Sequence, residues 1–448
     1  MFQTAAKLHW YLPRWRQART LVKLTNELRR EREMTACQWQ ELRNRRLRAL
    51  LTFAGEHVPY YRRLFDQCGF DPSSADLPNH LRRIPILTKD LIRAHRDELI
   101  ADTASASGLF KNASGGSTGV PLDFFQDQNY KTFKQAISVY YREWWGIRPY
   151  DRTATIWGGV PERRRLRVRC LNSFEMNGAT MREFSKMLAD WRPPYLFGYA
   201  SGLATFAHFV KDNRISGLRF RAIRSGADML WPHQRELIEE AFRSPVYNHY
   251  GSREVNNIAA ECPEGRRMHL ISTWRYVEIA DEEGRPVPVG TPGSILVTDL
   301  TNCGMPFIRY RNEDVGALAQ EPCSCGRASP VLDQLHGRTT DVIYSPSGEM
   351  IHGHFFAKLL QVRGSWFRQF QVYQPSMERL LVRYVPAGPG HQAAIREVLD
   401  LMAARLGPGV TLELEVRDQI PPLHNGKHCY VLSDVHSHEA DRAASIST

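Results

Sequence analysis

The chain has 448 residues, of which 42% are hydrophobic and 24% charged, and its net charge is +11. This length and apolar content predict a large core in two or three domains and argue against a disordered chain. The charge is uneven, because residues 1–50 hold 12 Lys and Arg against 4 Asp and Glu. Since the excess sits in one segment and no nucleic-acid module is recognisable, nucleic acid is not an expected partner.

Residues 1–50 are predicted to form a basic, amphipathic, helical arm. Its apolar residues alternate with Arg and Lys, which is typical of a helix on an anionic membrane surface and also of a helix that packs on the main body. The second interpretation is favoured. No apolar run is long enough to span a bilayer, and no secretion signal is present, so we expect a cytoplasmic protein, with peripheral membrane contact as the alternative. The apolar residues of the arm are Trp10, Tyr11, Trp15, Leu21, Val22, Leu24 and Leu28.

Helical periodicity continues from Glu41 to Phe65 and is interrupted at Pro59. The first hundred residues are therefore expected to be mainly helical.

The next informative segment is the glycine- and hydroxyl-rich stretch from Asn112 to Pro121. Glycines allow backbone amides to approach an anion closely, and hydroxyls add neutral donors, so the stretch predicts a phosphate-binding loop. A flexible turn is the alternative. A Walker-type loop is excluded, because Val120 and Pro121 follow the last glycine where Lys and Ser or Thr are required. The residues expected to bind phosphate are Ser114, Gly115, Gly116, Ser117, Thr118 and Gly119.

Beyond this loop, short apolar runs alternate with helical stretches, which indicates an α/β body. The predicted strands are 154–157, 195–199, 221–225, 246–249, 276–279 and 294–298. A smaller module follows, with strands at 370–373, 380–385 and 411–416 and a helix at 392–406. We therefore predict an α/β body at 51–338 with a helical N-terminal region, a small α+β lid at 339–433, and a flexible tail at 434–448.

Three of the eight cysteines and one histidine form a metal-binding pattern. Cys323 and Cys325 make a Cys-x-Cys turn, and Cys262 and His269 lie on another loop. Three thiolates and one imidazole are a ligand set that structural zinc prefers. Ordinary surface thiols are the alternative, and the other cysteines are expected to pack in the interior.

Several segments of the chain match motifs of one known superfamily and stand in the same order. They are the 112–121 loop, Tyr250-Gly251-Ser252-Arg253-Glu254, the stretch 307–314, the stretch 337–341, and Gly426-Lys427. Together they resemble the adenylate-forming superfamily of acyl-CoA synthetases. The segments 58–61, 84–89 and 197–201 are similar to the phenylacetate-CoA ligase branch and its CapK-like relatives in capsular polysaccharide biosynthesis. The resemblance covers about residues 55–433.

The resemblance implies an ATP- and Mg²⁺-dependent ligase that activates a carboxylic acid as an acyl-adenylate and transfers it to coenzyme A. It assigns Lys427 as the catalytic cation, Glu254 as the Mg²⁺ ligand, and Thr340 as the hinge. An exposed loop lysine and a surface carboxylate are the alternatives for Lys427 and Glu254, and a turn-capping aspartate is the alternative for Asp314. The residues assigned to the nucleotide besides the loop are Gly226, Ala227, Asp228, Tyr250, Gly251, Asp314 and Arg338.

Three positions depart from the superfamily pattern. Arg253 stands where Ser or Thr is usual, Thr340 where the hinge is usually Asp or Lys, and Asn425 where a small hydroxyl residue is common. These departures leave open a second function, a nucleotide-binding accessory protein of capsular or exopolysaccharide biosynthesis with reduced or no turnover. The acid and the oligomeric state are not predicted.

Overall fold

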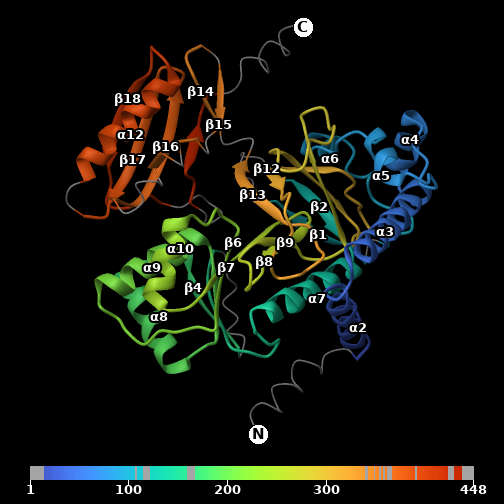
Figure 1. Cartoon of the computed structure of the whole chain (residues 1–448), viewed down its shortest axis with the longest axis horizontal. Coiled ribbons are helices and arrows are strands. Elements are labelled where there is room, and N and C mark those ends of the chain that lie inside the picture. Colours follow the sequence, from blue (N-terminus) through green and yellow to red (C-terminus); the bar gives the residue numbers. More distant parts are fainter. Residues whose placement is uncertain are drawn as a thin grey trace.

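The computed structural model describes the chain with several gaps, and every structural statement below concerns the described part. Figure 1 shows a helical N-terminal region, a central region of sheets and helices, and a small C-terminal unit. The described residues are 15–105, 108–114, 122–158, 167–338, 342–347, 349–352, 355–356, 359–360, 366–388, 391–421 and 428–435.

The N-terminal region is helical, as predicted. Helix α3 (Ala36–His57) begins with a capping box in which Thr35 and Gln38 exchange side-chain and backbone hydrogen bonds, and it runs without a break past residue 50. Pro59 starts α4 (Pro59–Cys68), because proline fits the first turn of a helix but cannot continue the preceding one. The short elements α5 (Leu77–His80), η1 (Leu81–Arg83) and α6 (Lys89–Ala94) complete the region.

Helix α2 (Trp15–Glu31) packs against α7 (Gln128–Trp144). Leu21 and Leu28 are buried in one core with the aromatic side chains of α7. The buried Glu31 carboxylate accepts a hydrogen bond from the Thr273 backbone N–H at 2.8 Å. The apolar side of the described part of the arm thus packs on the body, which is the interpretation favoured above.

A seven-stranded sheet forms the middle of the molecule, in the order β4-β3-β5-β6-β7-β8-β9. Strands β4 to β7 pair in parallel and β8 and β9 are antiparallel. Apolar residues on one face pack against α8, α9 and α10, and those on the other face pack against α7 and α2. The strands are β3 (Thr153–Trp157), β4 (Val168–Asn172), β5 (Tyr195–Gly198), β6 (Ala222–Gly226), β7 (Val246–Ser252), β8 (Asn256–Glu261) and β9 (Met268–Leu270), and the helices are η3 (Ser173–Glu175), α8 (Gly178–Trp191), α9 (Ala200–Asp212) and α10 (Pro232–Phe242).

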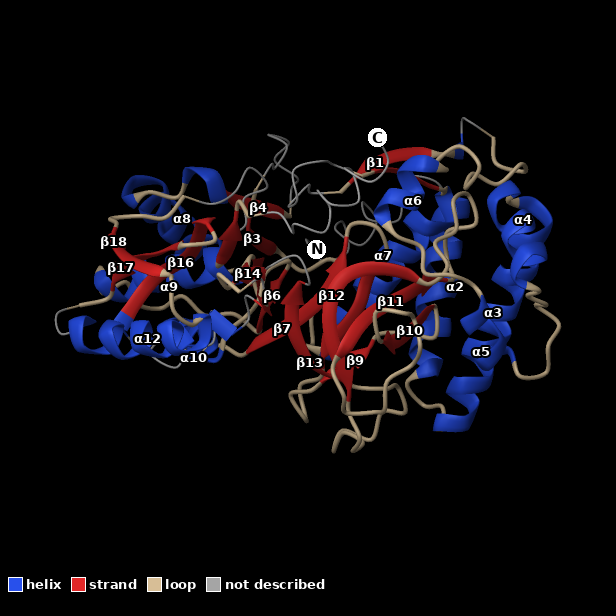
Figure 2. Ribbon diagram, turned by 90° about the horizontal axis from the view of Figure 1, so that it is seen from above, coloured by secondary structure: helices blue, strands red, loops and turns tan. Residues whose placement is uncertain are grey.

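A second, antiparallel sheet of four strands lies beside the N-terminal helices (Figure 2). It shares a large core with α3, α4 and the hairpin of β1 (Phe110–Ala113) and β2 (Asp123–Gln126). Its strands are β10 (Arg275–Ala280), β11 (Gly293–Asp299), β12 (Tyr310–Leu318) and β13 (Leu332–Arg338).

The C-terminal region contains a small α+β unit with its own core. Its four-stranded sheet has the order β18-β17-β16-β19, and β14 and β15 form a separate pair. The elements are β14 (Val342–Tyr344), β15 (Met350–His352), β16 (Phe367–Ser376), β17 (Arg379–Pro386), α12 (His391–Leu406), β18 (Thr411–Val416) and β19 (Val431–Ser433). None of the described helices combines the length and apolar character needed to cross a membrane.

Candidate nucleotide site and metal centre

Ser114, the first residue of the predicted phosphate-binding loop, is paired with Leu122. Its backbone N–H donates to the Leu122 carbonyl at 2.9 Å, and its Oγ accepts from the Leu122 N–H at 2.8 Å. These two bonds continue the antiparallel pairing of β1 and β2, whose last pair is Ala113 with Asp123. Residues 115–121, which connect Ser114 to Leu122, lie outside the described part of the chain.

The turn between β7 and β8 lies beside the Ser114 end of the β1–β2 hairpin, although it is 140 residues away in the sequence. Arg253 Nη1 donates to the Ala113 carbonyl at 3.0 Å, and Gln126 Nε2 donates to the Arg253 carbonyl at 3.3 Å. Glu254 follows and is 8% exposed. The structure thus brings the residue before Glu254 into contact with the residue before Ser114, in two segments that the resemblance assigns to one phosphate site.

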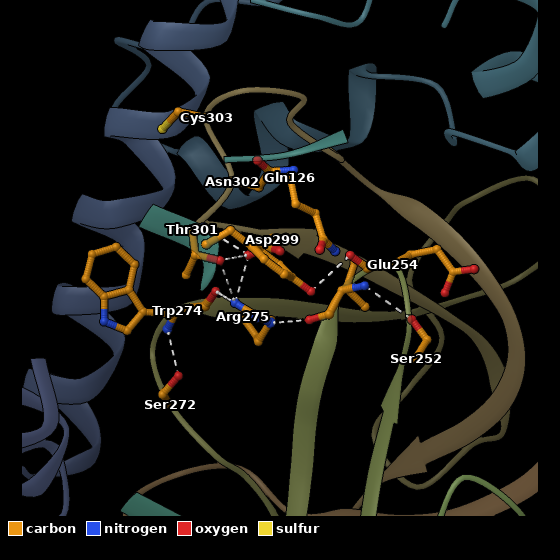
Figure 3. Close-up of polar contacts among 12 residues, drawn as sticks. Gln126, Ser252, Glu254, Ser272, Trp274, Arg275, Asp299, Thr301, Asn302 and Cys303 are labelled. Atoms are coloured by element: carbon orange, nitrogen blue, oxygen red, sulfur yellow. Dashed lines mark hydrogen bonds and ion pairs between the residues drawn. The ribbon is translucent and has the colours of Figure 1, made fainter. Parts of the chain in front are cut away.

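The Glu254 carboxylate has no hydrogen-bond or ion-pair partner among the described residues, and it points away from the buried ion pair behind it (Figure 3). Its backbone carbonyl accepts from the Tyr130 hydroxyl at 3.4 Å, so the main chain is held while the carboxylate is not. A carboxylate next to a phosphate loop, with oxygens left for another ligand, suits Mg²⁺.

The ion pair behind the turn joins Arg275 and Asp299, which are 1% and 2% exposed in their side chains, at 2.8 Å. Arg275 Nε also donates to the Val255 carbonyl at 2.8 Å, directly after Glu254 (Figure 3). Burial raises the pKa of Asp299, against the opposing effect of the Arg275 charge and the Thr301 hydrogen bonds. This pair was not predicted from the sequence, because isolated Arg and Asp residues 24 positions apart form no recognisable motif.

The residues assigned to the nucleoside also come together. The Tyr250 hydroxyl donates to Asp314 Oδ2 at 2.7 Å and accepts from Asn312 Nδ2 at 2.6 Å. Asp314 pairs in register with Arg338 across β12 and β13. At Gly251 a Cβ atom would lie 2.2 Å from the Asn256 carbonyl oxygen, so only glycine allows the chain to turn so tightly beside Tyr250.

The segment Gly226-Ala227-Asp228 follows β6 at the edge of the sheet where the parallel strands end. Ala227 has a positive φ of 72°, which bends the chain sharply. The Asp228 carboxylate accepts from the backbone N–H groups of Ala200 at 2.5 Å and Ser201 at 3.1 Å. The Asp228 carboxylate therefore caps the N-terminus of α9.

The predicted zinc ligands form one cluster. The ligand atoms of Cys262, His269, Cys323 and Cys325 all lie within 4.8 Å of one another. Two of the separations are 3.6 Å, between the Cys262 and Cys323 Sγ atoms, and 3.3 Å, between Cys325 Sγ and His269 Nε2. A tetrahedral zinc with bonds of about 2.3 Å to sulfur needs ligand separations of about 3.8 Å, so the cluster is close to the required size.

The surroundings of the cluster also fit a metal. Burial alone would raise the pKa of Cys262, but hydrogen bonds from His269 and from backbone N–H groups outweigh it and lower that pKa to about 6. His269 Nδ1 lies 3.1 Å from the Ser329 carbonyl oxygen, which leaves Nε2 for the metal. At Gly265 a Cβ atom would lie 2.3 Å from Cys323 Sγ, so glycine is needed for the loops to approach.

Some of the predicted site residues fall outside the described part of the chain. These are Gly115, Gly116, Ser117, Thr118 and Gly119 of the loop, the hinge residue Thr340, and the catalytic Lys427. For Arg338 only the backbone is described. Their assignments stay predictions.

Comparisons with known proteins agree with the resemblance. Residues 343–434 match the family model of the CapK C-terminal domain. The chain is 25% identical over 380 residues to a phenylacetate-coenzyme A ligase of Thermus thermophilus, covering 82% of this chain and 80% of the relative. It is 23% identical over 411 residues to protein CapK of Staphylococcus aureus, covering 88% and 89%.

Among solved structures, the fold is similar to a 2-hydroxyisobutyryl-CoA ligase in two states. The postadenylation state in complex with R3-HIB-AMP gives a TM-score of 0.74 at 21% identity, covering 93% of this chain and 94% of that one. The thioesterification state gives 0.61 at 22% identity, covering 94% of each. The chain is thus a homologue of phenylacetate-CoA ligases and CapK with an adenylate-forming fold, and both the predicted resemblance and the predicted fold class are confirmed.

Proposed function

We propose that the protein is an ATP-dependent acid–thiol ligase, which forms an acyl-adenylate and then a thioester with coenzyme A. The main support for this proposal is the contact between Arg253 and Ala113. This contact joins the segment of Glu254 and Tyr250, which is bonded to Asp314, to the segment of Ser114. A loop for phosphates, a ligand for Mg²⁺ and acceptors for a ribose are what an ATP site needs. The homology to phenylacetate-CoA ligases supports the same conclusion.

In the first half-reaction a carboxylate oxygen of the acid attacks the α-phosphorus of ATP, and the bond to the β-phosphate breaks to release pyrophosphate. The residues from Ser114 to Gly119 bind the β- and γ-phosphates in this proposal. The carboxylate of Asp314 binds the ribose, since its two oxygens can accept from Tyr250 and from a ribose hydroxyl. Tyr250, Gly226 and Ala227 surround the adenine, and Arg338 contacts the ribose or phosphate.

Glu254 is the residue that would hold Mg²⁺, and the ion would supply positive charge to the phosphates. Lys427 supplies a further positive charge to the α-phosphate and carboxylate oxygens when the C-terminal domain closes. A cation that arrives only on closing stabilises mainly the transition state. In the second half-reaction the thiol sulfur attacks the acyl carbon, and AMP leaves.

The C-terminal domain, residues 339–433 with its hinge at Thr340, acts as the mobile lid in this proposal. The cluster of Cys262, His269, Cys323 and Cys325 binds a structural zinc ion that joins the loop before β9 to the loop after β12. The hinge assignment rests on the resemblance, and the zinc assignment rests on the spacing of the four ligand atoms.

A second function is favoured by a specific observation, the match to CapK along most of the chain. In this alternative the protein binds nucleotide as an accessory factor of capsular polysaccharide assembly and has little turnover. Arg253 and Thr340, where the superfamily pattern is lost, are the residues that favour it.

One experiment separates the two functions. Carboxylate-dependent exchange of labelled pyrophosphate into ATP is measured with the full chain across a broad panel of acids. A ligase exchanges label with at least one acid, and Lys427→Ala lowers that rate sharply while ATP affinity changes little. Silence with every acid, at ATP concentrations that demonstrably saturate the protein, would favour the accessory function.

A further inference from the structure

Arg224 on β6 has no role in the proposed function. Its guanidinium is largely enclosed and has no acidic partner among the described residues. Its Nη1 donates to the hydroxyl of Tyr141, and its Cζ lies 4.5 Å from the centre of the Phe197 ring. Its Nε is buried and has no hydrogen-bond partner. A cation is thus held among aromatic rings without a counter-charge.

The register of the sheet fixes the direction of this side chain. Arg224 is paired with Phe197 on β5 and with Tyr247 on β7, and residues paired in this way lie on the same face. That face is covered by α7, from which Tyr141 comes. Arg224 therefore lies inside the body, two residues before the Gly226-Ala227-Asp228 segment assigned to the adenine.

The neighbouring titratable groups do not supply a negative charge. Burial and the Arg224 charge together lower the pKa of His249 well below its usual range, so this imidazole is neutral. Tyr141 and Tyr195 are phenols, and burial raises the pKa of Tyr195 to about 12. The next cation, Arg142, lies over the Tyr195 ring at 4.4 Å. The space between α7 and the sheet is thus positive, which is costly unless an anion binds there.

An aromatic surface lies next to Arg224 on the same face of the sheet. Trp157, at the end of β3, lies 5.6 Å from the Phe197 ring and is stacked on Tyr199 at 4.1 Å. Because β3, β5 and β6 are parallel, Trp157 and Tyr199 lie at the edge where the nucleotide segment begins. A flat apolar group bound on Trp157 and Phe197 would therefore lie between the segment assigned to the adenine and the Arg224 guanidinium.

We propose that Arg224 selects the acid, and that the substrate is a dicarboxylic acid with a flat apolar spacer, whose second carboxylate pairs with Arg224. This proposal rests on the ligase function above, because the first carboxylate is the one that becomes adenylated. An arginine pairs with a carboxylate through two parallel hydrogen bonds, so the second carboxylate fixes the orientation of the acid as well as its charge.

The test compares acids that differ only in the second carboxylate: phenylacetate with 4-carboxyphenylacetate, and benzoate with terephthalate. Exchange of pyrophosphate is measured with the full chain, and kcat/KM is compared within each pair. We expect the dicarboxylate to be preferred at least tenfold in one pair, Arg224→Met to abolish or reverse the preference, and Arg224→Lys to retain part of it. Arg219→Met, at an exposed position, is the matched control and should leave the preference unchanged.

A preference for monocarboxylates, or an equal loss of activity on both acids in Arg224→Met, would assign Arg224 a purely structural role. Thermal shift provides a readout that does not need turnover. 4-Carboxyphenylacetate should raise the melting temperature of the native chain and of Arg219→Met but not of Arg224→Met. Such a shift without any exchange would keep the binding site and reject the ligase function, and neither shift nor preference would overturn the proposal.

Discussion

At the scale of single residues, the proposed Mg²⁺ ligand Glu254 gives the most specific prediction. If its carboxylate binds Mg²⁺, replacing Glu254 by Gln removes a negatively charged ligand but keeps size and polarity. We expect the exchange rate at saturating ATP to fall about a hundredfold, and the Mg²⁺ concentration for half-maximal rate to rise. Glu236→Gln, an exposed carboxylate on α10, is the control. A Glu254→Gln enzyme with an unchanged Mg²⁺ profile would show that the carboxylate does not bind the metal.

Arg275 carries an expectation about stability. Removing its guanidinium leaves the buried Asp299 carboxylate without its ion-pair partner. Breaking such a buried pair costs about 3–5 kcal/mol. Urea unfolding of Arg275→Met should report a loss of this order, whereas Arg285→Met, which removes an ion pair at the surface, should leave the midpoint nearly unchanged. An Arg275→Met protein as stable as the native one would mean that Asp299 is protonated or finds another partner.

The sequence identified candidate site residues where a motif contains them. Ser114, Glu254, Tyr250 and Asp314 come from segments with several characteristic residues in a row; the structure joins Tyr250 to Asp314, and the residue before Glu254 to the residue before Ser114. Arg275 and Arg224 were missed for the opposite reason. Each is one arginine in an ordinary strand, and its importance arises from a partner, or the lack of one, that only the folded chain reveals.

At the scale of secondary-structure elements, most apolar strands of the α/β body were predicted to within one residue at each end. These include β3, β5 and β6, whose near-continuous apolar runs are typical of buried parallel strands. Strand β12 was missed, because it contains Arg311, Asn312, Glu313 and Asp314 and so lacks an alternating pattern. Asn312 and Asp314 both bond to the Tyr250 hydroxyl, whereas Arg311 donates to the Glu282 carbonyl and Glu313 pairs with Lys89, so polar contacts rather than apolar burial hold this strand.

The predicted zinc cluster also belongs to this scale, since its ligands come from two segments that are far apart in the sequence, Cys262 and His269 on one and Cys323 and Cys325 on the other. We expect the protein purified without chelators to contain about one zinc ion per chain. Cys262→Ser should lose the metal and melt at lower temperature, while Cys37→Ser, at an exposed position, should keep both. Metal analysis and thermal unfolding check this. Native protein that contains no zinc under these conditions would refute the metal site.

At the scale of the whole molecule, the proposed mechanism makes the position of the C-terminal domain the determinant of which half-reaction can proceed. The described arrangement matches the postadenylation state of the similar ligase better than its thioesterification state, with TM-scores of 0.74 and 0.61 at nearly equal coverage. In Figure 1 the domain lies beside α9 and α10. Large motions of this kind use discrete interfaces that form in one state and separate in the other.

The interface in this arrangement is formed by a few side chains. Trp231, before α10, is 7% exposed and packs in the core of the C-terminal domain. Gln234 Nε2 donates to the Tyr430 hydroxyl at 2.9 Å, and Arg368 of β16 pairs with Asp212 of α9 at 2.9 Å. The ion pair is partly exposed and contributes little, so the burial of Trp231 is the main attraction.

Replacing Trp231 by Ala should therefore weaken this arrangement relative to the others. We expect the pyrophosphate exchange rate to fall at least tenfold, while thioester formation from a supplied acyl-adenylate and coenzyme A changes less, because that step requires the domain to leave this position. Trp366→Ala, which removes a Trp that is 36% exposed on the same domain, is the control. An equal loss in both half-reactions would indicate that Trp231 stabilises the α10 region as a whole, and that the interface does not govern the alternation between them.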